Sequence, residues 1–247
     1  MIRLLVHGGW IIVLTLLTQL GGIAWLLACF SRWRWLTFVS CYAALSVCAA
    51  FVAPMTGRVP LPCSGEPLRV QSWAYCALNR HYVVPELHQV LLDVAKRSAE
   101  RHAGTITQVL DANFPFVDGF PLLPHLSHSD GRKADIAFHY TDGEGQYLPG
   151  RTRSPIGYFA FEQGATACVE QILSLRWDLE WLQPYLGDLS PDVVRMRTAM
   201  AFLRTDQRVG KVFLEPHLQR SWHVGGPKVR FQGCRAARHD DHIHVQL

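Results

Sequence analysis

Two histidine-rich segments hold the residues best suited to chemistry. One runs from Pro124 to Asp135, and the other, from His239 to Val245, lies close to the end of the chain. On a β-strand, side chains two positions apart share a face, so His242 and His244 are expected to point the same way. Two imidazoles on one face, alternating with apolar residues, indicate a platform for a metal ion.

A catalytic zinc ion takes three protein ligands and leaves its fourth position to water. His128 and Asp135 are candidates for the remaining ligands, because a loop that contains Gly131 can fold back and bring them together. Alone, this pair would more simply be a loop histidine beside a solvated acid; the terminal His242-x-His244 favours the metal. Imidazoles outnumber carboxylates, which favours Zn²⁺ over Mg²⁺ or Ca²⁺ and leaves manganese and iron as alternatives.

The spacing of these residues resembles a known family of zinc sites. The pattern Ser127-His128-x-x-Gly131-x-x-Ala134-Asp135, followed by His242-x-His244, is similar to that of the LAS superfamily, the lysostaphin, D-alanyl-D-alanine peptidase and hedgehog-like group. Within it, penicillin-insensitive murein endopeptidases and D,D-carboxypeptidases are the most similar. The resemblance covers roughly residues 70–247 and implies an α+β LAS zinc domain that hydrolyses peptide bonds in peptidoglycan.

The resemblance also implies a role for each matching residue. His128, Asp135 and His244 would be the zinc ligands, and His242 would lie beside the metal. In the carboxypeptidase branch the general base is a glutamate three residues before the last ligand, where this chain has Asp241. That position faces away from His244 on a regular strand, so Asp241 can be the base only if the chain turns there. His242 is therefore the preferred base and Asp241 the second choice.

Four further polar residues flank these positions. Ser127 could orient a ligand by a hydrogen bond, and His239 is expected next to the ligands. Arg132 could neutralise an oxyanion or a substrate carboxylate, and His125 could line the cleft. The simpler interpretations are a loop hydroxyl that satisfies backbone groups, a packed histidine, and a surface ion pair of Arg132 with Asp130.

Hydrophobic periodicity predicts the elements that must position this site. It predicts helices over Pro85–Arg101, Gly164–Trp181 and Asp192–Arg204, and strands over Thr105–Leu110, Lys133–Phe138, Val209–Leu214 and His242–Leu247. The Pro- and Gly-rich segment Asn113–Pro124 is expected to be irregular. Helices and strands without a regular βαβ alternation indicate an α+β domain.

The N-terminal region of the chain is apolar. Gly8–Phe30 and Trp35–Ala53 contain no Asp, Glu, Lys or Arg and are long enough to cross a bilayer. We expect a transmembrane hairpin within residues 1–56, a linker over 57–69 and the zinc domain over 70–247. A cleaved signal peptide, a lipoprotein signal or a pair of core helices are the alternatives.

Charge and cysteine content bear on partners and compartment. All 20 acidic side chains and 20 of the 24 basic ones lie in residues 59–247, a balance that argues against nucleic-acid binding. Arginines flank both sides of the apolar runs, so charge leaves the membrane orientation open. Outside the runs, Cys63, Cys76, Cys168 and Cys234 permit three disulfide pairings; we favour 63–76 with 168–234, against four unpaired thiols. Disulfides would indicate an oxidising compartment.

Together, the LAS resemblance and the apolar segments predict a zinc metallopeptidase in the inner membrane with its catalytic domain in the periplasm. Its expected partners are peptidoglycan peptides and the lipid bilayer, with no nucleic acid. A non-catalytic, zinc-containing receptor module and a metal-handling membrane protein are the alternative hypotheses.

Overall fold

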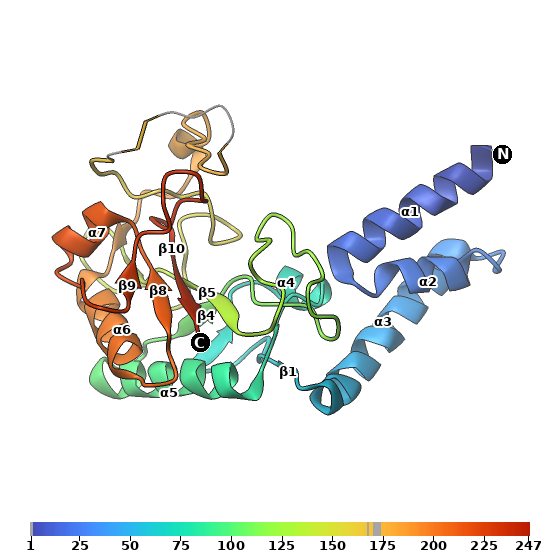
Figure 1. The fold of residues 1–247 in the computed structure, drawn as a ribbon, viewed down its shortest axis with the longest axis horizontal. Coiled ribbons are helices and arrows are strands. Elements are labelled where there is room, and N and C mark those ends of the chain that lie inside the picture. Colours follow the sequence, from blue (N-terminus) through green and yellow to red (C-terminus); the bar gives the residue numbers. More distant parts are fainter. Residues whose placement is uncertain (1, 167, 170–173) are drawn as a thin grey trace. The chain divides into compact units, whose positions relative to one another are not determined.

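A computed structural model describes residues 2–166, 168, 169 and 174–247. The chain forms two compact units, each assembled from separate stretches of sequence. The first comprises residues 1–61, 73–85 and 111–133, and the second comprises 62–72, 86–110 and 134–247. Helices and strands are intermixed, as the α+β prediction requires (Figure 1).

The second unit contains a six-stranded mixed sheet. Its strands, in spatial order, are β2 (Leu68–Val70), β4 (Thr107–Val109), β5 (Lys133–Ala137), β10 (His242–Gln246), β8 (Lys211–Phe213) and β9 (Val229–Arg230). β2 pairs with β4, and β8 with β9, in parallel; β4 pairs with β5, and β10 with β8, in antiparallel fashion. The strands predicted from alternation are all present, each one or a few residues shorter than expected.

Helices supply the other side of this core. They are α5 (Pro85–Arg101), α6 (Val193–Thr205) and the short α7 (Pro216–Ser221), with a small sheet of β6 (Tyr140–Thr141) and β7 (Ser190–Pro191) and the 3-10 helix η2 (Gln183–Tyr185). α5 has the predicted bounds, because Pro85 suits a first helical turn and an apolar stripe is buried along its length. α6 begins after Asp192, whose side chain accepts a hydrogen bond from the Arg195 N–H.

The two middle strands of the sheet carry the predicted site residues. Ile243 and Val245 are fully buried, and they alternate along β10 with His242 and His244. The alternation places both imidazoles on the opposite face from the apolar pair, as predicted. β5, which contains Asp135, is the next strand in the sheet.

The first unit contains the apolar front of the chain. Its elements are α1 (Ile2–Thr18), α2 (Gly21–Ala28), α3 (Arg34–Val52), the 3-10 helix η1 (Ala53–Thr56), β1 (Val59–Pro60), α4 (Trp73–Ala77) and β3 (Tyr82–Val83). β1 begins within the segment predicted as a linker and pairs with β3. Leu20, Ala49 and Ala53 pack with Tyr82 in a buried apolar cluster. The helices are therefore built into this unit rather than joined to it by a loose tether.

The predicted continuous span over residues 8–30 is wrong. α1 ends at Thr18, and Gln19 adopts a left-handed conformation with φ of 65°. The Thr18 hydroxyl then accepts a hydrogen bond from the Gly21 N–H at the start of α2. A side chain at Gly22 would collide with Thr15, so the glycine lets α2 fold closely against α1.

One helical segment of the described chain is long and apolar enough to cross a membrane. It runs from Arg34 through α3 to Thr56, and α1 is shorter than a spanning helix requires. One side of α3 is polar: the Tyr42 hydroxyl donates to the Ala77 carbonyl at 2.6 Å, and the Asn79 amide donates to the Tyr42 oxygen at 2.9 Å. The prediction of two spans is thus reduced to one candidate span.

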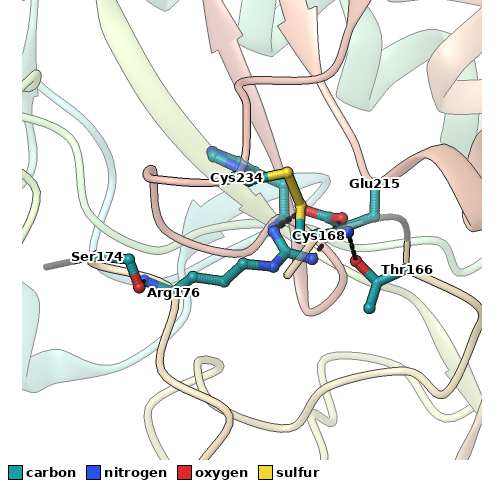
Figure 2. Close-up of a disulfide and its surroundings, with 7 residues drawn as sticks. Thr166, Cys168, Ser174, Arg176, Glu215 and Cys234 are labelled. Atoms are coloured by element: carbon teal, nitrogen blue, oxygen red, sulfur yellow. Dashed lines mark hydrogen bonds and ion pairs between the residues drawn. A yellow bond between two sulfur atoms is a disulfide. The ribbon is translucent and has the colours of Figure 1, made fainter. Parts of the chain in front are cut away.

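The predicted helix over Gly164–Trp181 is also wrong within the described residues of that range; residues 167 and 170–173 lie outside them. Its described residues form neither helix nor strand, and a disulfide joins Cys168 to Cys234 (Figure 2). Close to it, the Arg176 guanidinium makes two hydrogen bonds, at 3.0 and 2.8 Å, to the buried carboxylate of Glu215. The disulfide and the ion pair thus connect Cys168 and Arg176 to residues far away in the sequence.

Candidate metal centre

A buried carboxylate and two imidazoles meet on the polar face of the sheet. Asp135 Oδ1 lies 2.9 Å from His244 Nδ1, and Asp135 Oδ2 lies 3.6 Å from His242 Nε2. All three side chains are at most 4% exposed. Residues more than a hundred positions apart in sequence are therefore in contact, as the predicted ligand pair of Asp135 and His244 requires.

Asp241 completes a chain of contacts through His242. Its Oδ1 lies 2.5 Å from His242 Nδ1, and its Oδ2 accepts a hydrogen bond from the Phe159 N–H at 2.5 Å. Phe159 has a φ of 68°, a region that non-glycine residues rarely adopt, and its carbonyl accepts from the Gln183 amide. This backbone conformation presents the Phe159 N–H to the carboxylate, so Asp241 is held by the loop and by His242 together.

Burial and charge act in opposite directions on His242. Burial lowers its pKa, but the carboxylates of Asp135 and Asp241 outweigh this and raise the pKa to about 9. A cation bound to Asp135 would offset that carboxylate's attraction and lower the pKa of His242 again. The proton on this imidazole is thus coupled to the charge at the neighbouring ligand position.

Tyr158 is a site residue that the sequence patterns do not identify. Its hydroxyl donates a hydrogen bond to Asp135 Oδ2 at 2.6 Å, and its ring meets the His242 ring edge-on at 5.0 Å between centroids. It lies in a segment without helix or strand, where no periodicity assigns a direction to side chains. The preceding Gly157 has a φ of 80°, so a glycine just before an aromatic residue is a local signal of a constrained turn here.

His128 belongs to the first unit. It is buried, and its Nδ1 lies 2.9 Å from the carbonyl oxygen of Ala112. A carbonyl accepts only a protonated nitrogen, so Nδ1 carries a proton, and in the neutral imidazole Nε2 then carries the lone pair. Metal-ligating histidines usually make such a bond with their second nitrogen.

Two sets of described side chains could hold a metal ion. One is His128 with Asp135 and His244, the three predicted ligands, and the other is Cys63 and Cys76 with His81. Both of these cysteines are disulfide-bonded, so they offer no thiolate. The first set has two nitrogen donors and one oxygen donor, all buried, which suits zinc. The identity of the ion, and the role of His128 as third ligand, remain predictions.

The other predicted residues occupy distinct surroundings. His239 is buried with its ring 4.9 Å from that of His242 and 5.7 Å from that of His244, the neighbouring position expected for it. His125 Nδ1 lies 2.9 Å from the buried carboxylate of Asp111. Ser127 and Arg132 are exposed.

Two further acids of the second unit, Glu162 and Asp240, have raised pKa values. Burial raises the pKa of Glu162 to about 6, against the opposing attraction of Arg153. Burial likewise raises the pKa of Asp240 to about 6, although Arg238 binds its carboxylate. Two acids whose pKa values lie close to neutral in the same unit as Asp241 make this region responsive to pH.

Compared with the models of known protein families and with curated protein sequences, the chain matches none of them.

Proposed function

We propose that this chain is a membrane-anchored zinc metallopeptidase that hydrolyses peptide bonds of peptidoglycan. The observation that carries the proposal is the buried contact of Asp135 with both His244 and His242. His128, Asp135 and His244 offer two nitrogen donors and one oxygen donor within 4.8 Å of one another, a donor set that suits zinc. His128, Asp135 and His244 would hold the zinc ion.

When bound, zinc lowers the pKa of a water ligand to about 7 and polarises the substrate carbonyl. His242 would accept the proton of that water at Nε2, since Asp241 engages its Nδ1. Asp241 fixes the orientation and tautomer of the imidazole, the role that a carboxylate plays beside a catalytic histidine. Tyr158 holds Asp135 in place by its hydrogen bond to Oδ2.

Other features support the substrate class and the compartment. The LAS-like spacing of the ligands points to peptidoglycan peptides. The disulfide between Cys168 and Cys234 fits an oxidising compartment such as the periplasm, and the apolar segment Arg34–Thr56 fits a membrane anchor.

The test is hydrolysis by the full chain in detergent micelles, with murein sacculi or crosslinked muropeptides as substrate. We expect zinc-dependent release of soluble products and their loss on chelation. His244→Ala should lower both bound zinc and turnover by more than about a hundredfold, because it removes a ligand rather than a supporting contact. His88→Ala, which replaces a half-buried histidine of α5, is the matched control and should keep both.

Wild-type protein that binds zinc stoichiometrically but releases no products from either substrate would contradict the peptidase and favour the receptor alternative. Protein that binds no zinc, with turnover unaffected by chelation, would contradict the metal centre.

A further inference from the structure

Arg58 lies where the apolar helices end. Its N–H donates to the Ala53 carbonyl, and Gly57 before it adopts a left-handed conformation that turns the chain. The Arg58 side chain is only 3% exposed. Its Nη1 donates to the Phe114 carbonyl at 2.7 Å, and its Nη2 is paired with the Asp118 carboxylate. A buried guanidinium with specific acceptors is costly to place and is strongly oriented by them.

The same guanidinium packs against Gly131. A Cβ atom at Gly131 would lie 2.5 Å from Arg58 Nε, so only glycine fits there, and the φ of 74° also favours glycine. The Gly131 N–H donates to Asn113 Oδ1 at 2.9 Å, and its carbonyl accepts from the Val84 N–H at 2.9 Å. Arg58 therefore contacts both ends of the segment 114–131.

That segment contains His128. The neighbouring Ser129 carbonyl accepts a hydrogen bond from the Gly119 N–H at 2.8 Å, which ties the returning part of the segment to its beginning. Gln19, in the turn between α1 and α2, holds the same segment at a second point, where its Oε1 accepts from the Phe116 N–H at 3.0 Å. All these contacts lie within the first unit.

We propose that Arg58 is a positioning residue for His128: it couples the end of the apolar helices to the segment that carries this ligand, so the helices help to form the metal centre. The inference rests on the proposed function, since it gives His128 the role of a zinc ligand. It also assigns a reason to the glycine of the His128-x-x-Gly131 pattern, which admits the guanidinium.

The test is metal affinity of the full chain in detergent, measured by competition with a chromophoric chelator and by the visible spectrum of the Co²⁺-loaded protein. We expect Arg58→Ala to weaken Zn²⁺ and Co²⁺ binding about tenfold, the usual effect of losing a contact that supports a ligand, and to alter the Co²⁺ spectrum. Arg58→Lys keeps the charge and the aliphatic stem and should recover part of the affinity.

The matched control is Arg195→Ala, which removes an ion-paired arginine of α6 from the second unit. It should lower the melting temperature of the metal-free protein without changing metal affinity. If Arg58 has only a structural role, Arg58→Ala should likewise lower the melting temperature and leave metal affinity unchanged. Wild-type affinity and a wild-type Co²⁺ spectrum in Arg58→Ala would therefore overturn the inference. If Arg58→Ala does not fold, wild-type affinity in Arg58→Lys overturns it instead.

These results separate the inference from the proposed function. If the wild-type chain binds no zinc, the proposed function fails. If wild-type binding is lost in His244→Ala but unchanged in Arg58→Ala, the metal centre stands and the coupling fails.

Discussion

At the scale of single residues, both carboxylate oxygens of Asp135 have polar partners. Tyr158 donates to one of its oxygens and His244 lies against the other. In the proposed metal centre, Asp135 and His244 would both serve as ligands of the zinc ion. The Tyr158 hydroxyl donates to the other oxygen, Oδ2, and so would orient the Asp135 carboxylate with or without a bound ion.

Tyr158→Phe is expected to weaken zinc binding by about tenfold while leaving the fold intact, since the ring is retained and one supporting hydrogen bond is lost. Chelator competition on the full chain measures the affinity. Tyr185→Phe is the control, because Tyr185 is 81% exposed. Equal zinc affinity in both variants would show that Tyr158 does not support the ligand.

The sequence predicts the residues of the site unevenly. His242 and His244 are predicted correctly to share a face, because a strand's period of two is a local property. Asp135 also contacts them, as the LAS-like spacing of these residues implies. Tyr158 is missed, because its position depends on the tertiary path of an irregular segment, which no local pattern records.

At the scale of elements, the errors have a common cause. The absence of charge over residues 8–30 predicts burial or lipid contact but not continuity, and Gly21 and Gly22 already mark a helix break. Within Gly164–Trp181 an apolar period suggests a helix, yet the described residues form none and Cys168 is crosslinked to Cys234. In both cases a tertiary or side-chain contact overrides a weak local preference.

The Cys168–Cys234 disulfide closes a loop with a sequence separation of 66 residues. In the chain-entropy model such a crosslink stabilises the folded state by about 4 kcal/mol. Replacing both cysteines by serine should therefore lower the melting temperature of the full chain, and peptide mapping of the wild type without reductant should recover the linked peptides. The control is the double variant Cys41→Ser/Cys48→Ser, which replaces two cysteines that form no disulfide. A wild-type protein whose mapping recovers only unlinked cysteines would contradict the crosslink.

At the scale of the whole molecule, the apolar helices belong to the same compact unit as the segments 73–85 and 111–133. Tyr42 and Asn79 link α3 to the first of these segments, and Arg58 links its end to the second. The α+β class and most of the elements follow from sequence periodicity. The assembly of the first unit from three separate segments does not follow from periodicity, because contacts between distant segments leave no periodic signal.

The full chain is expected to remain in the membrane fraction after alkaline carbonate extraction, with the N-terminal residues still present by intact-mass measurement. The reason is that Arg34–Thr56 is long and apolar enough to span the bilayer. Intact mass also distinguishes this outcome from a cleaved signal sequence, which would remove the start of the chain. A shortened, extractable protein would refute the anchor.

The interleaving of the two units limits how this protein can be processed. The backbone passes from one unit to the other after residues 61, 72, 85, 110 and 133. A protease that cuts directly after the last helix of the apolar region, at residue 56, would split the first unit, because its segments 73–85 and 111–133 stay with the rest of the chain. If the chain is the anchored peptidase proposed above, release from its anchor by such a cut would remove the apolar helices from the unit that contains His128.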